Sequence, residues 1–118
     1  MFDPVQFFNL ASQLCSPSAA EAYLRTSIGR CYYASFLTAR ERLATYGHYR
    51  PLGTGADHQG VIDTLARLGR RPLRDRLDSL RQLRARADYD LQRPMGFKDT
   101  ERAKRLAQNL LGETSQIT

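Results

Sequence analysis

The chain has 118 residues, of which 42% are hydrophobic, and a formal net charge of +6. This length suits one domain over residues 1–118, and no stretch approaches the roughly 20 uninterrupted apolar residues of a membrane span. Two cysteines are too few for a disulfide scaffold, and two histidines without paired spacing argue against a structural zinc site. We therefore expect a cytoplasmic protein with reduced thiols.

Two helices are expected in the first part of the chain, and a proline begins each. The first runs from Pro4 to about Cys15, and the second runs from Pro17 to about Tyr46. Proline suits the first helical position, because its missing N–H would have no partner there. Gly47 is the expected C-cap of the second helix. The apolar residues of that helix recur every three or four positions: Leu24, Ile28, Tyr32, Phe36, Ala39 and Leu43.

Glycine and proline place a loop over residues 48–56, before a third helix. Asp57 is the expected cap of this helix, and Gly69 is expected to end it. A fourth helix begins near Pro72. We predict that one face of the fourth helix is formed by Leu73, Leu77, Leu80, Arg84, Ala87 and Leu91.

The last expected helix follows a second loop, over residues 92–97. Asp99 can cap it, and we expect Gly112 to end it, with the tail to Thr118 frayed. No segment alternates with the period of two that strands require. We therefore predict an all-α fold, an antiparallel up-and-down bundle of four or five helices joined by short loops.

The most informative position is Arg84, which stands where the apolar face of the fourth helix predicts a leucine. A guanidinium cannot lose its charge, so it needs a carboxylate or a solvated groove. Asp88 lies one turn later, and Tyr89 is beside it. One interpretation is an internal salt bridge that fixes helix packing. The other is a groove in which these three residues bind or cleave an anionic substrate.

Arginines gather around this position. Residues 70–93 contain eight arginines and four aspartates, so most of the positive excess of the chain lies there. Ion pairs along a solvated helix explain part of this pattern. Contact with phosphates is the alternative, and in that case Arg81 and Arg86 are candidate ligand-binding residues.

His58 is the remaining candidate for catalysis, because histidine suits general acid–base chemistry near neutral pH. The alternative is a hydrogen-bonded packing residue at the start of the third helix. Tyr32 lies on the core face of the second helix, where its hydroxyl would need a partner, and Tyr33 is a third candidate for ligand binding. The chain has no phosphate-binding glycine loop, and we expect neither a cofactor nor a metal.

Three stretches together resemble the HEPN superfamily of small helical domains. They are residues 27–36 (Ser-Ile-Gly-Arg-Cys-Tyr-Tyr-Ala-Ser-Phe) with Ala39 and Arg40, residues 58–61 (His-Gln-Gly-Val) and residues 83–89 (Leu-Arg-Ala-Arg-Ala-Asp-Tyr). More narrowly, they resemble a prokaryotic HEPN branch whose fourth helix ends in Arg, then Ala-Asp-Tyr. The resemblance covers about residues 20 to 112.

This resemblance implies an up-and-down helix bundle that pairs as a homodimer. In the ribonuclease members, an arginine and a histidine about five residues later form the catalytic motif. Such members act as toxins or defence nucleases, and many are encoded beside a nucleotidyltransferase antitoxin. Arg84 matches the family arginine, but the position five residues later is Tyr89. Metal-independent RNA cleavage therefore lacks its usual acid or base, unless the fold brings His58 close to Arg84.

Three hypotheses follow. The first is a dimeric RNA-binding domain, of the ribonuclease-type toxin or defence class, in which Arg84 holds a phosphate while Asp88 and Tyr89 orient it or the attacking 2′-hydroxyl. The second is a non-catalytic interaction module that partners a nucleotidyltransferase antitoxin. The third is a nucleotide-binding module that uses the same groove.

Overall fold

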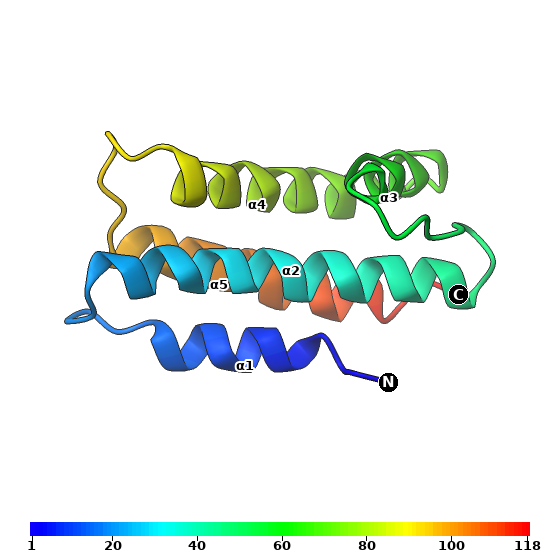
Figure 1. Ribbon diagram of the computed structural model, residues 1–118. Helices are drawn as coiled ribbons and strands as arrows, with labels where there is room; N and C mark the ends of the chain where they lie inside the picture. Colours follow the sequence, from blue (N-terminus) through cyan, green and yellow to red (C-terminus); the bar gives the residue numbers. More distant parts are fainter.

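The computed structural model describes residues 1–118 and contains five helices and no strand (Figure 1). The predicted all-α bundle is therefore confirmed. None of the helices has the length and apolar character needed to cross a bilayer. In chain order the helices are α1 (Val5–Leu14), α2 (Glu21–Thr45), α3 (Ala56–Arg67), α4 (Arg71–Tyr89) and α5 (Phe97–Thr114).

Four of the helices lie along the long axis of the molecule, and each runs opposite to the one before it (Figure 1). The long helix α2 is central: it packs against α1, α4 and α5. The short helix α3 sits at the end of the bundle where α2 finishes, and it packs against α4 and α2. This arrangement brings the middle of α2 and the second half of α4 together.

The core consists of one cluster of 20 buried residues, to which α2 contributes the most. Every residue of the face predicted for α2 is buried. A fully buried leucine or isoleucine side chain stabilises a fold by roughly 1.5–3 kcal/mol, so this periodic face accounts for the central place of α2. Gly47 ends the helix as predicted, with a φ of 75° and with the His48 N–H donating to the Leu43 carbonyl.

The start of α2 differs from the prediction. The helix begins at Glu21, because residues 16–20 form a turn instead. The Ser16 carbonyl accepts a hydrogen bond from the Ala19 N–H at 3.0 Å, and Ala20 is extended with a ψ of 150°. Serine side chains compete with helical hydrogen bonding, and Ser16 does so here by accepting from the Ser18 N–H.

The inward face of α4 also differs from the prediction. Leu83 takes the position after Leu80, with only 2% of its surface exposed, and Arg84 lies at the edge of the buried face. Residues three and four positions after Leu80 share one side of a helix, and the leucine is the one that enters the core. Leu91 lies beyond the end of the helix and is exposed.

The end of the chain is docked rather than frayed. Helix α5 continues past Gly112 to Thr114, and Ile117 is buried in the core cluster. Arg42 of α2 holds this tail, because its Nε donates to the Ile117 carbonyl at 2.6 Å and its Nη2 to the Ser115 carbonyl at 2.7 Å. At the other end of α5, the Asp99 carboxylate accepts from the Gly96 N–H at 2.8 Å, so Asp99 caps the helix from its third position.

Asp57 does not cap α3 as expected. Its side chain is buried and turns back to the α2–α3 loop, where it accepts from the N–H groups of Leu52 at 2.8 Å and Gly53 at 3.0 Å. The Tyr49 hydroxyl also donates to this carboxylate. A side chain at position 60 would collide with the Tyr49 ring, so the packing of the loop on α3 requires glycine at this position.

Candidate functional site

The structure places Arg84 next to both of its predicted companions. Its Nε lies 2.9 Å from the Asp88 Oδ2, yet the N–H is not directed at that oxygen and makes no hydrogen bond. The Arg84 side chain is 22% exposed and that of Asp88 is 37% exposed. The pair is therefore a partly solvated ion pair at the rim of the core and not an internal salt bridge.

Tyr33 of α2 lies between two guanidinium groups. The Arg84 Cζ is 5.3 Å from the centre of its ring, and the Arg30 Cζ is 5.1 Å from the same centre. The ring of Tyr89 is 5.7 Å from the Arg84 Cζ. Cations at these distances are attracted by the negative faces of aromatic rings. Arg30 was missed in the sequence, although its place one turn before Tyr33 was the available signal.

His58 is brought to the same neighbourhood from α3. Its ring stacks on Phe36 with centres 4.3 Å apart, and it meets the Tyr33 ring edge to face with centres 6.1 Å apart. The buried Tyr32 hydroxyl is hydrogen-bonded to the His58 Nδ1 and has no other partner. Because a buried hydroxyl proton is rarely left without an acceptor, we assign Tyr32 as the donor and Nδ1 as the acceptor, which puts the proton of the neutral imidazole on Nε2.

The surroundings of His58 also keep it uncharged. Burial lowers its pKa from 6.5, and the positive charges of Arg81 and Arg84 lower it further. At neutral pH this imidazole therefore has no proton to spare as an acid, and its one lone pair is bonded to Tyr32. The geometry favours the packing role of His58 over the catalytic one.

The remaining candidate residues separate into two groups. Arg81 lies one turn before Arg84, and its Nη1 donates to the Gln59 Oε1 at 3.4 Å. Arg86 is about 200° around the helix from Arg84, at 100° per residue, and no hydrogen bond, ion pair or cation–π contact joins its side chain to the site. The site therefore contains Arg81 and Tyr33 but not Arg86.

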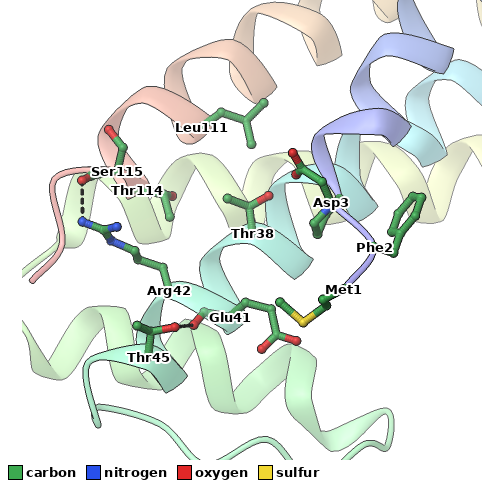
Figure 2. Close-up of a pocket in the computed structure, with 11 residues that line it drawn as sticks. Met1, Phe2, Asp3, Thr38, Glu41, Arg42, Thr45, Leu111, Thr114 and Ser115 are labelled. Carbon is green, nitrogen blue, oxygen red and sulfur yellow. Dashed lines mark hydrogen bonds between the residues drawn. The ribbon is translucent and has the colours of Figure 1, made fainter.

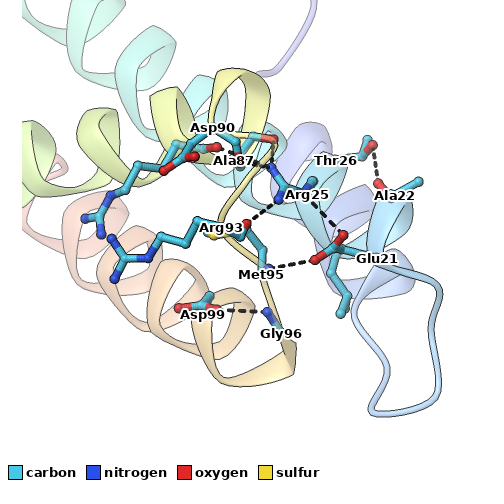
Figure 3. Close-up of polar contacts among 12 residues, drawn as sticks. Glu21, Ala22, Arg25, Thr26, Ala87, Asp90, Arg93, Met95, Gly96 and Asp99 are labelled. Atoms are coloured by element: carbon cyan, nitrogen blue, oxygen red, sulfur yellow. Dashed lines mark hydrogen bonds and ion pairs between the residues drawn. The ribbon is translucent and has the colours of Figure 1, made fainter.

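A different arginine fixes the end of α4, where Asp88 and Tyr89 lie (Figure 3). Arg25 of α2 donates to four backbone carbonyls, with distances of 3.3, 2.8, 3.1 and 2.6 Å. Glu21 lies one turn before it, 3.8 Å away, and accepts from the Met95 N–H at 2.7 Å. These bonds satisfy the last carbonyls of α4 and tie the α4–α5 loop to α2. The four carbonyls belong to Arg86, Ala87, Asp90 and Arg93.

The arginines of the site use their donors very differently from Arg25. Arg30 makes no hydrogen bond or ion pair, Arg84 has only the ion pair, and Arg81 has a single long hydrogen bond. Each guanidinium has five N–H donors. The site thus holds three fixed positive charges, one carboxylate and many unused donors, which is an arrangement suited to an anionic ligand.

The molecule has one pocket, and it lies elsewhere (Figure 2). It has a volume of about 370 Å³, is open to solvent and is lined by the N-terminal segment and the C-terminal halves of α2 and α5. Thr38 and Thr114 line it, and their hydroxyl groups have no hydrogen-bond partner. None of the predicted site residues reaches it.

Comparison with known proteins does not place the chain. No family model, no curated protein and no solved structure matches it. The function must therefore be argued from the residues themselves.

Proposed function

We propose that this protein is a HEPN-type helical domain that acts as a homodimer and binds RNA through Arg30, Tyr33, Arg81 and Arg84. The observation that carries the proposal is that Arg30 and Arg84 hold their guanidinium groups over the Tyr33 ring without making a hydrogen bond. Arg81, one turn before Arg84, adds a third positive charge and uses a single donor. Guanidinium groups match phosphate oxygens in charge and in the spacing of their donors. The exposed ring of Tyr89, 73% accessible, offers a surface on which an unpaired base can stack.

The resemblance in the sequence supports the same site. The three HEPN-like stretches are far apart along the chain, yet each supplies a side chain to this one location. Residues 27–36 supply Arg30 and Tyr33, residues 58–61 supply His58, and residues 83–89 supply Arg84. Two of these stretches place guanidinium groups over one tyrosine ring, which supports a shared role in holding an anion, whereas His58 keeps the packing role described above.

We propose binding without cleavage. Cleavage by a 2′-hydroxyl needs a base to accept its proton and an acid for the leaving oxygen. Tyr89 stands where the ribonuclease members have histidine, and the only imidazole nearby, His58, has its lone pair bonded to Tyr32. We therefore expect labelled RNA to remain intact after long incubation with the protein.

The test compares two substitutions that each remove one charge from α4. Arg84→Ala removes a guanidinium of the site, and Arg86→Ala removes one that does not contact it. We expect Arg84→Ala to weaken the binding of a labelled single-stranded RNA about tenfold or more and to reduce its salt dependence by about one counterion. Arg86→Ala should have a clearly smaller effect. Equal effects of the two, or no salt-dependent binding by the wild type, would contradict the proposal.

The second candidate is a non-catalytic interaction module, and the Asp88 carboxylate beside Arg84 favours it because it already pairs the guanidinium that a phosphate would need. In that case wild type and Arg84→Ala behave alike towards RNA, and a nucleotidyltransferase encoded next to this protein should co-purify with it. The third candidate, a nucleotide-binding module, is tested by adding AMP. If the site is built for a nucleotide, AMP at a concentration equal to that of the protein should displace the labelled RNA.

A further inference from the structure

The site belongs to a longer row of side chains that crosses three helices. The row starts at the N-terminal segment, continues through α1 and α2, and ends on α4. Successive centres lie 5.0, 4.7, 5.1, 5.3 and 5.7 Å apart, measured between two rings at the first step and between a guanidinium carbon and a ring at the others. We call it the aromatic–arginine row, and its members are Phe2, Phe7, Arg30, Tyr33, Arg84 and Tyr89.

The row is a surface feature and not part of the core. Both of its ends are exposed, Phe2 by 51% and Tyr89 by 73%, and its inner members are half-buried. The guanidinium carbons of Arg30 and Arg84 lie over the rings. Arg30 makes no hydrogen bond or ion pair, and Arg84 has only the Asp88 carboxylate beside its buried Nε. An apolar partner helix would leave their N–H donors unpaired on docking, at a high cost. The partner that fits is anionic and has flat faces of its own.

We infer that the aromatic–arginine row is a track for single-stranded RNA, with phosphates at the guanidinium edges and bases against the exposed rings. The inference rests on the RNA binding proposed above and extends the site onto α1. Bases offer their faces only when they are unpaired, and single-strand binding proteins combine positive grooves with aromatic rings in this way. A mononucleotide would cover one step of the row, whereas a strand of several nucleotides can contact both ends.

The test uses the two exposed ends of the row, Phe2→Ala and Tyr89→Ala. Tyr23→Ala is the matched control, since Tyr23 is also exposed, by 57%, and lies outside the row. The probes are labelled oligouridylates of three and of twelve nucleotides, and a labelled duplex of twelve base pairs. We expect the wild type to prefer the longer strand over both other probes. Each end substitution should weaken the binding of the longer strand about fivefold or more, whereas Tyr23→Ala should not.

The outcomes separate this inference from the proposed function. If no probe shows salt-dependent binding, the proposed function fails, and the track fails with it. If binding depends on Arg84 but the end substitutions behave like Tyr23→Ala, or the duplex binds as tightly as the strand, only the track is overturned. Phe2 also lines the cavity of Figure 2, so Phe2→Leu provides a second variant. It keeps an apolar wall, removes the ring and should weaken binding as Phe2→Ala does.

Discussion

Two arginines near the end of α4 have similar burial and opposite uses. The Arg25 side chain is 14% exposed and the Arg84 side chain 22%. Arg25 places its donors on four backbone carbonyls, whereas Arg84 lies between two aromatic rings without a hydrogen bond. The difference shows that burial alone does not identify a structural arginine. A structural arginine is identified instead by how many of its N–H donors have a protein acceptor.

The comparison predicts the largest loss of stability for Arg25→Ala. The substitution leaves the last carbonyls of α4 without partners, and a hydrogen bond to a charged group makes a net contribution of about 1.5–3 kcal/mol. We expect the free energy of unfolding to fall by about 3 kcal/mol or more, measured by denaturant titration. Arg25→Lys keeps the charge without the forked donors and should lose less. If Arg25→Ala lowered the free energy of unfolding by less than about 1 kcal/mol, Arg25 would not differ from Arg84 as a structural arginine.

Arg42 belongs to the same kind as Arg25, with two donors on the carbonyls of the tail. We expect Arg42→Ala to cost about 2 kcal/mol and to speed hydrogen exchange of the amides of residues 115–118. Arg102 on α5 is exposed and has no partner, so Arg102→Ala is the control for loss of charge. If hydrogen exchange of these amides were unchanged in Arg42→Ala, burial of Ile117 alone would hold the tail in place.

The third prediction concerns the pH dependence of His58. Because its pKa in the folded protein is below 6.5, the unfolded chain binds the proton first as the pH falls. Its contribution to stability is therefore complete above about pH 6.5 and is lost as the pH falls below that value. Titration of the ring protons by NMR should give a pKa below 6.5, and His58→Gln should flatten the stability profile in this range. A measured pKa above 6.5 would contradict this prediction, and His58 would again be a candidate general acid for RNA cleavage.

The smallest effect on stability is expected for Arg84→Leu. Partly exposed ion pairs contribute about 0–1 kcal/mol, and a leucine can pack at the edge of the core. We expect a change in unfolding free energy within about 1 kcal/mol, together with the loss of RNA binding. Thermal melts and binding titrations on one preparation measure both. A loss near 3 kcal/mol would place Arg84 with Arg25 among the structural arginines.

Much of the bundle could be predicted from periodicity, because burial of a helix face depends on residues three or four apart. The buried faces of α2 and the glycine ends of α2 and α3 follow from such local patterns. The position of Arg84 could be predicted only approximately, because Leu83 and Arg84, three and four residues after Leu80, both lie on the helix face that contains Leu80. The choice between them depends on the neighbouring helices, which a single helix does not encode.

The contacts that escaped prediction join distant parts of the chain. Arg25 meets its carbonyl partners more than 60 positions later, and Arg42 meets the tail 73 and 75 positions later. Backbone carbonyls occur at every residue, so the sequence gives no sign of which ones an arginine will bind. For the same reason, the pairing of Arg30 with Phe7 and Tyr33 became visible only once α1 was packed on α2.

Asp57 makes the α2–α3 loop sensitive to a single proton. The N–H of Leu52, the Tyr49 hydroxyl and the N–H of Gly53 all favour the charged carboxylate and lower its pKa below 3.8. Its contribution to stability is thus complete above about pH 3.8 and is lost in stronger acid. Protonation would weaken every one of these bonds at once, so acid unfolding should release Tyr49 and the loop backbone together, in one cooperative step.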